Sequence, residues 1–240
     1  MIQQQPSPFI RVDDYPVGDP TFLDRAPREV YLTQLFRALS LFEDKGVPYK
    51  LGVTPLLIEP RDVDRLNETV KLGEIVMHGF NHGWNFKPWS NITSTWASGG
   101  EFGMVPATEL QRRYSFCDKI MRQFKRYDPL THIPPFNCYN QDFVDVFAMN
   151  GGKVILGCDK DHVAYNHGSF VLDGVSVNLS RWQVSYADVP VVLQALLDGK
   201  IDLLKEHITL HWMYDTTQNP QWFSQYGRLA DEFLKRVAVP

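Results

Sequence analysis

The chain has 240 residues, of which 44% are hydrophobic, and a formal net charge of -4 at pH 7. This length and apolar content are typical of a globular domain with a large core and exclude a disordered chain. The charge balance, with no dense basic run, excludes a nucleic-acid-binding surface, so we expect one domain over residues 1–240 and no nucleic-acid partner.

No segment of the sequence is typical of membrane insertion or secretion. The N-terminus has no positively charged start followed by an apolar stretch, and no apolar run approaches the roughly 18 residues of a membrane helix. The three cysteines are odd in number and lack a Cys-x-x-Cys spacing, which indicates thiols in a reducing compartment. We therefore expect a cytoplasmic protein, and the oligomeric state stays open.

The spacing of apolar residues predicts alternating strands and helices. This alternation is typical of an α/β fold with a mainly parallel sheet, open or closed into a barrel. In such folds the chemistry collects at the carboxyl ends of the strands. In chain order we predict a strand at Phe9–Val12, a helix at Arg28–Lys45, a strand at Tyr49–Val53, a helix at Arg61–Leu72, a strand at Glu74–Met77, a helix at Thr108–Tyr127, a strand at Leu130–Ile133, a helix at Gln141–Met149, a strand at Val154–Leu156, a hairpin of Phe170–Leu172 with Val175–Leu179, a helix at Ala187–Leu197, a strand at Ile208–Leu210 and a helix at Trp222–Val237.

Polar side chains follow two of these strands. Asp13 and Asp14 follow the first strand, and His78 and His82 follow the third in the motif HGFNH. Two imidazoles four residues apart and one carboxylate can hold a divalent ion with open positions, so Asp14, His78 and His82 are predicted to bind one metal ion, Zn first, with Co, Mn, Ni or Fe as alternatives. Asp13 is then predicted to take a proton from water activated by the ion. An accidental histidine pair and a solvated Asx turn remain the alternatives.

Two later motifs suggest the remaining catalytic groups. In THIPPFNCYN the two prolines fix a bend that can present the Phe136 N–H to a developing oxyanion, unless the loop is merely stiff. His211 follows the last strand, and a histidine with a near-neutral pKa can protonate a leaving amine, unless it is a core residue.

A long segment rich in aromatic residues bears on the substrate. From Gly83 to Pro106 the chain carries Trp, Phe and Asn side chains, which suit the apolar faces and hydroxyls of a sugar, although the same aromatics could simply pack the loop on the barrel. We predict oxyanion- or substrate-binding roles for Phe136, Pro135, Asn137, Asn140, Trp84, Trp182 and Trp212.

The order of these motifs resembles the polysaccharide deacetylase family, also called the NodB-homology or carbohydrate esterase 4 group. R-x-D-D-Y-P and H-G-F-x-H resemble its shorter, divergent members, and the resemblance runs from Arg11 to about Tyr214. It implies a distorted, NodB-like (β/α) barrel of about seven mainly parallel strands with one divalent metal ion. It also implies Asp13 as the general base, Asp14, His78 and His82 as metal ligands, Phe136 as the oxyanion donor and His211 as the general acid.

The sequence departs from the family pattern in two places. Ile133 stands where the family has an arginine that orients the base, and Arg11 or Arg181 could replace that arginine. The Asp-Trp motif that tunes the catalytic histidine has its nearest match at Trp182, for which Asp159 or Asp161 could supply the acid.

These motifs predict a metal-dependent hydrolase of carbon–nitrogen bonds other than peptide bonds. It is expected to remove an acetyl or similar small acyl group from an N-acylated amino sugar, its conjugate or a glycan. One alternative is hydrolysis of a non-sugar bond, such as a cyclic amide or formamide. Another is a non-catalytic glycan-binding relative, which the missing arginine at position 133 favours and the retention of Asp13 and His211 opposes.

Overall fold

The structure is a computed structural model. It describes residues 8–16, 28–82, 100–102, 105–137, 139–158, 170–172, 174–180, 182–184, 189–212 and 220–238. The described strands form one nine-stranded sheet in the order β6-β7-β5-β4-β3-β2-β1-β9-β8.

Strands and helices alternate along most of the chain. The strands are β1 (Ile10–Tyr15), β2 (Tyr49–Val53), β3 (Glu74–His78), β4 (Tyr127–Ile133), β5 (Val154–Cys158), β6 (Phe170–Leu172), β7 (Val175–Ser180), β8 (Gln183–Val184) and β9 (Ile208–Leu210). The helices are α1 (Arg28–Lys45), α2 (Pro60–Thr69), α3 (Ala107–Met121), α4 (Gln141–Met149), α5 (Val189–Leu197) and α7 (Trp222–Val237), with short 3-10 turns at η2 (Pro55–Leu57), η4 (Gly100–Phe102) and η5 (Pro135–Asn137).

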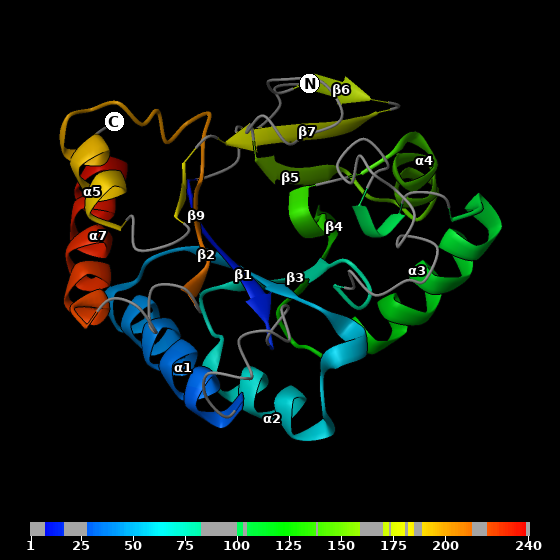
Figure 1. Ribbon diagram of the computed structural model, residues 1–240, viewed down its shortest axis with the longest axis horizontal. Helices are drawn as coiled ribbons and strands as arrows, with labels where there is room; N and C mark the ends of the chain where they lie inside the picture. The colour runs from blue at the N-terminus through cyan, green and yellow to red at the C-terminus, as the bar shows by residue number, and fades with distance from the viewer. Residues whose placement is uncertain are drawn as a thin grey trace.

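The sheet curls, and the helices surround its outer side (Figure 1). From β7 to β8 every neighbouring pair is parallel, and only β6 at the edge runs antiparallel to its partner β7. The two edge strands β6 and β8 are not neighbours in the sheet order, so the barrel is open over the described residues. This arrangement confirms the predicted distorted (β/α) barrel.

The core lies between the outer face of the sheet and the helices. In α1 the buried residues Leu32, Leu35, Leu39 and Phe42 recur at helical spacing and pack in the same cluster as the apolar residues of β1 and β2. The burial of these faces, more than local propensity, holds such helices in place. None of the described helices combines the length and the apolarity needed to cross a membrane.

Several element boundaries differ from the predictions. The first strand continues beyond Val12 through both acids to Tyr15, and the third helix ends at Met121, well before Tyr127. Tyr127 instead begins β4, where it pairs with Ile75 of β3. An aromatic residue fits a helix or a strand, so here the sheet pairing decides. The second helix ends at Thr69 instead of Leu72, and the two-residue β8 is too short to leave a pattern.

Candidate active site and metal centre

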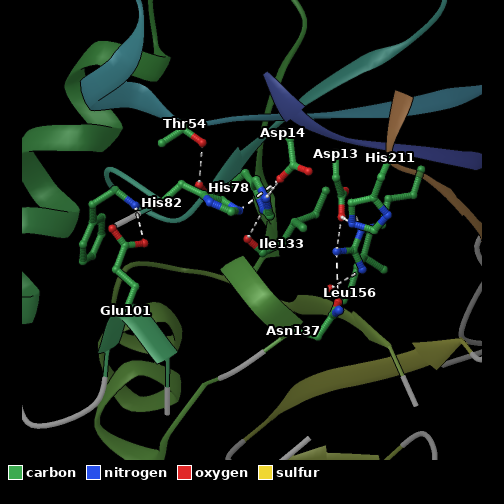
Figure 2. Close-up of polar contacts among 12 residues, drawn as sticks. Asp13, Asp14, Thr54, His78, His82, Glu101, Ile133, Asn137, Leu156 and His211 are labelled. Atoms are coloured by element: carbon green, nitrogen blue, oxygen red, sulfur yellow. Dashed lines mark hydrogen bonds and ion pairs between the residues drawn. The ribbon is translucent and has the colours of Figure 1, made fainter. Parts of the chain in front are cut away.

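The two adjacent acids of β1 face the same side of the sheet. Regular alternation would turn Asp14 away from Asp13 and toward the side of Val12. Asp14 instead has a φ of 68°, and the pairing of β1 with β2 shifts register between Val12 and Tyr15. This irregularity brings both carboxylates to one site at the carboxyl end of the strand (Figure 2).

Asp14, His78 and His82 form one buried cluster. Asp14 Oδ1 lies 3.0 Å from Nε2 of His78 and 3.0 Å from Nε2 of His82. One possible ligand atom from each side chain lies within 4.8 Å of the other two. Figure 2 shows these three side chains converging from β1 and from the end of β3. The structure therefore brings the three predicted metal ligands together.

The hydrogen bonds of His78 indicate that this cluster needs a cation. His78 Nδ1 lies 3.0 Å from the carbonyl oxygen of Ile133, which only accepts, so Nδ1 carries a proton. A neutral His78 then turns an Nε2 lone pair toward the Asp14 carboxylate, and these two acceptors repel each other. A second proton or a metal ion between them removes the repulsion. The N, N, O donor set, with its Nδ1 fixed by a carbonyl, fits a divalent ion such as Zn.

The charges within the cluster support each other. Burial raises the pKa of Asp14, but when the histidines are protonated the charge of His82 and the hydrogen bonds from both imidazoles outweigh burial and hold this pKa well below its usual value. Burial lowers the pKa of His82, but the neighbouring Asp14 outweighs it and raises the pKa. A proton and a metal ion therefore compete for this cluster, and metal binding is expected to strengthen as the pH rises.

Arg11 holds Asp13 beside the cluster. Arg11 Nε donates to Asp13 Oδ1 at 2.7 Å and Nη2 to Oδ2 at 2.5 Å, and both side chains are 1% exposed. The guanidinium also donates to the Leu156 carbonyl at 3.0 Å and to Asn137 Oδ1 at 3.1 Å. Arg11 thus makes the charged contact with Asp13 that the sequence does not supply at Ile133.

Asp13 also faces His211. Burial raises the pKa of Asp13, but Arg11, then His78, outweighs burial and lowers it. On the side away from Asp14, His211 Nε2 lies 3.7 Å from Asp13 Oδ2 (Figure 2). A carboxylate that stays ionised and a partly buried imidazole thus lie side by side next to the metal cluster.

The proline turn borders the same site. Pro135 is buried and packs against Gly79, where a Cβ would collide with its ring. Asn137 accepts the hydrogen bond from Arg11. Phe136 lies between them in the backbone of η5, and its side chain is outside the described part of the structure. The turn is therefore next to both the metal cluster and the ion pair.

Unusual backbone conformations collect at this site. In the described part of the chain, the non-glycine residues with positive φ are Asp14 at 68°, His82 at 52° and Asn137 at 56°. Each belongs to the cluster or touches the ion pair beside it. Residues in this region carry strain that the surrounding structure must hold, and such positions gather at functional sites.

Two supporting residues could not be found from the sequence. The Thr54 hydroxyl donates to the carbonyl oxygen of His78 at 3.2 Å. The Glu101 carboxylate accepts hydrogen bonds from the backbone N–H groups of Phe80 and Asn81, between the two histidines. Neither residue belongs to a motif that would mark it in the sequence.

Two of the predicted substrate-binding residues, Trp212 and Asn140, make contacts within the fold. Trp212 is fully buried and packs edge-on to Tyr31, so its side chain offers no surface to a substrate. Asn140 caps α4 by accepting from Phe143 N, and it donates to the Phe102 carbonyl. Burial and helix capping therefore explain these two residues.

Trp182 lies away from His211. Its indole donates to Glu206, which precedes β9, and the next residue, Gln183, pairs with Thr209. Trp182 is thus toward the amino ends of β8 and β9, whereas His211 follows the carboxyl end of β9. The structure therefore does not bring Trp182 to the histidine. Trp84, Asp159, Asp161 and Arg181 lie outside the described residues.

No protein-family model matches the sequence, and no curated protein matches it. Several solved structures are similar in fold, among them the following three. A Mycobacterium smegmatis protein, provisionally described as a polysaccharide deacetylase, has a TM-score of 0.63 at 13% identity, over 99% of this chain and 87% of its own. A family 4 carbohydrate esterase from Streptomyces lividans, in complex with acetate, has a TM-score of 0.53 at 11% identity, over 96% of this chain and 90% of its own. A carbohydrate esterase 4 pseudoenzyme from Bacillus anthracis has a TM-score of 0.50 at 10% identity, over 97% of this chain and 63% of its own.

At these identities the likeness concerns the fold alone. The chain has the fold of the polysaccharide deacetylase group, as the resemblance in the sequence implies. This fold occurs in a protein described as an esterase and in one described as a pseudoenzyme. Any activity must therefore be argued from the residues of the site.

Proposed function

We propose that this chain, which has the polysaccharide deacetylase fold, is a metal-dependent hydrolase of the same superfamily. It removes an acetyl or similar small acyl group from the nitrogen of an amino sugar or a sugar conjugate. The observation that carries the proposal is the placement of Asp13 between Arg11 and His211, beside the cluster of Asp14, His78 and His82.

Asp14, His78 and His82 would hold the metal ion. A divalent ion supplies a Lewis acid that lowers the pKa of water and polarises an acyl carbonyl. Zn fits the donor set best, and Co, Mn, Ni and Fe are the alternative ions for this set. The Ile133 carbonyl and the Thr54 hydroxyl keep His78 in place for this role.

Asp13 takes a proton from the attacking water. The Arg11 fork fixes both carboxylate oxygens and keeps the carboxylate ionised, so that it accepts a proton without a change of conformation. His211 then protonates the departing amine, a role supported by its Nε2, which lies 3.7 Å from Asp13 Oδ2 beside the metal cluster. The Phe136 N–H, in the rigid turn after β4, is proposed to stabilise the oxyanion.

An N-acylated sugar is the proposed substrate class. The similar structures include a carbohydrate esterase bound to acetate, which is what deacetylation would release. The Trp-rich segment that includes Trp84 suits a sugar, but it lies outside the described residues. A cytoplasmic location stays a proposal that rests on the cysteine pattern, of which the structure describes one buried, free thiol at Cys117.

A glycan-binding protein without activity is the less favoured function. Such a protein would need neither a buried carboxylate held by an arginine fork nor a histidine facing it. The absence of arginine at position 133 favours a protein without activity, but Arg11 makes the contact with Asp13 that such an arginine would make.

Acetate release from a panel of N-acetylated amino sugars and their conjugates, with Zn or Co added, tests the proposal. We expect turnover in the wild type and a loss of at least about 100-fold in Asp13→Asn and in His211→Ala. Asp128→Asn is the matched control, because Asp128 is half-buried and pairs with Lys50 at the opposite end of the barrel. Equal turnover in wild type, Asp13→Asn and His211→Ala would contradict the assignment.

A further inference from the structure

Glu101 of η4 holds the turn that connects the two histidines. Its Oε2 accepts from Phe80 N at 2.9 Å and its Oε1 from Asn81 N at 2.7 Å. The carboxylate is 1% exposed, so water does not replace it as the acceptor for these groups. Figure 2 shows Glu101 next to His82, with its carboxylate directed at the turn. Both of its oxygens are therefore used on the backbone between His78 and His82.

The core fixes the position of Glu101. The next residue, Phe102, is fully buried, with its ring stacked on Phe143 at 3.9 Å between centroids and edge-on to Phe80 at 5.3 Å. The Phe102 carbonyl also accepts a hydrogen bond from Asn140, which caps α4. The packing of Phe102 thus holds η4 in place, and with it the backbone that carries Glu101.

The turn has little room to take another shape. Gly79 has a φ of +66°, and a Cβ there would collide with the Glu101 carboxylate and with the Pro135 ring. The turn therefore packs directly on the side chain that binds it. Without the carboxylate, two backbone N–H groups would have to move to find new acceptors, and the histidines at both ends of the turn would move with them.

We propose that Glu101 is a positioning residue for the metal centre. Its carboxylate fixes the backbone of the turn so that the Nε2 atoms of His78 and His82 converge on Asp14 and can share one ion. Outer contacts of this kind typically change metal affinity by about 10- to 100-fold when they are lost. This inference rests on the proposed function in one respect, namely that the cluster binds a metal ion.

The chain contains a matched control for this arrangement. Glu43 of α1 also accepts backbone N–H groups of a turn, from Lys71 at 2.9 Å and from Leu72 at 2.9 Å. That turn leads into the amino end of β3, whereas Glu101 binds the turn that follows the carboxyl end of β3. Loss of Glu43 therefore removes a similar carboxylate–backbone contact at the opposite end of the same strand, away from the cluster.

The experiment compares Glu101→Gln with Glu43→Gln in the full chain. An amide can accept one of the two hydrogen bonds, but its NH₂ group faces the other N–H unfavourably. Zn²⁺ affinity is measured by competition with a chromophoric chelator, and the visible absorption of the Co²⁺-loaded proteins reports the coordination geometry. Glu101→Asp, whose shorter side chain cannot reach both N–H groups, is measured in the same way and decides the case if Glu101→Gln does not fold.

We expect Glu101→Gln to bind Zn²⁺ about 10- to 100-fold more weakly than the wild type and to change the Co²⁺ spectrum. Glu43→Gln is expected to keep the wild-type affinity and spectrum, even if its melting temperature falls. Unchanged affinity in Glu101→Gln, or an equal loss in both variants, would overturn the role of Glu101 while leaving the metal site intact. A wild type that binds neither Zn²⁺ nor Co²⁺ would overturn the proposed function itself.

Discussion

Arg11 and Asp13, two residues apart on β1, form a two-point ion pair inside the barrel, with donor–acceptor distances of 2.7 and 2.5 Å. Their spacing places both side chains on one face of the strand, where no solvent separates them. The arginine thus comes from the same strand as the base that it holds. A buried carboxylate without this partner would be neutral over much of the acid range.

The pH dependence of the reaction tests this relationship. In Arg11→Met the cation is lost, burial dominates, and the pKa of Asp13 rises. A general base must be ionised, so the acid limb of the kcat/KM profile is expected to move to higher pH by about 1–3 units. Arg11→Lys keeps the charge and should shift the limb less.

The pH profiles need folded protein, because removal of one partner of a buried pair can cost about 3–5 kcal/mol of stability. They are therefore recorded well below the melting temperature of each variant. An acid limb in Arg11→Met at the wild-type position would show that Arg11 does not control Asp13.

Metal binding and proton transfer are expected to separate in two histidine variants. His211 faces Asp13 at 3.7 Å and is not part of the three-residue cluster, so His211→Ala should lower kcat by about 10²–10⁴-fold and keep its metal. His78→Ala should lose the metal as well. Metal content and kcat measured on the same preparations check this, and a loss of metal in His211→Ala would contradict the division of roles.

Gly79→Ala is expected to damage the metal turn. The substitution adds left-handed strain of about 1–2 kcal/mol and a collision with Glu101 and Pro135, so both stability and Zn²⁺ affinity should fall. Gly151→Ala is the control, since Gly151 has a φ of +88° and open space around the added Cβ. It should lose stability only. Denaturant unfolding and Zn²⁺ titration are measured for both variants. Wild-type Zn²⁺ affinity in Gly79→Ala would contradict this prediction.

Acid sensitivity is expected from His207, which is buried against Phe9 at the other end of the barrel. Burial lowers its pKa to about 3. The unfolded chain takes up this proton below about pH 6.5, so stability is present above that pH and is lost as the pH falls toward 3. The loss from this group amounts to about 2 kcal/mol at pH 5.

His207→Phe should therefore reduce the difference in unfolding free energy between pH 7.5 and pH 5 by about that amount. Phe9→Leu, which keeps the histidine, should retain the wild-type difference. Urea unfolding of each protein at pH 7.5 and at pH 5 measures this difference in unfolding free energy. The same pH difference in wild type and His207→Phe would contradict the neutral, buried state of this side chain.

Long periodic elements were predictable from the sequence. The bounds of α1, α4 and α7 agree with the predictions, because their apolar spacing and flanking breaks are unambiguous. The placement of Asp13, Asp14, His78 and His82 near one another was also predictable, since parallel strands bring their carboxyl ends to one edge.

Other features depended on contacts that no local pattern contains. Asp14 turns inward through its positive φ, within a strand and not after one. Glu101 reaches the metal turn because Phe102 anchors η4 in the core. Trp212 was predicted as a substrate contact because it follows His211 in the sequence. Adjacent residues at a strand end point to opposite sides, however, and Trp212 packs on Tyr31.

The most direct test of the central claim is elemental analysis of protein purified without chelator, for the wild type beside His78→Ala. The account predicts about one equivalent of Zn, Co, Mn, Ni or Fe in the wild type and its loss in the variant. A wild type that holds no metal, even after incubation with Zn or Co, would contradict the metal centre and the hydrolysis built on it.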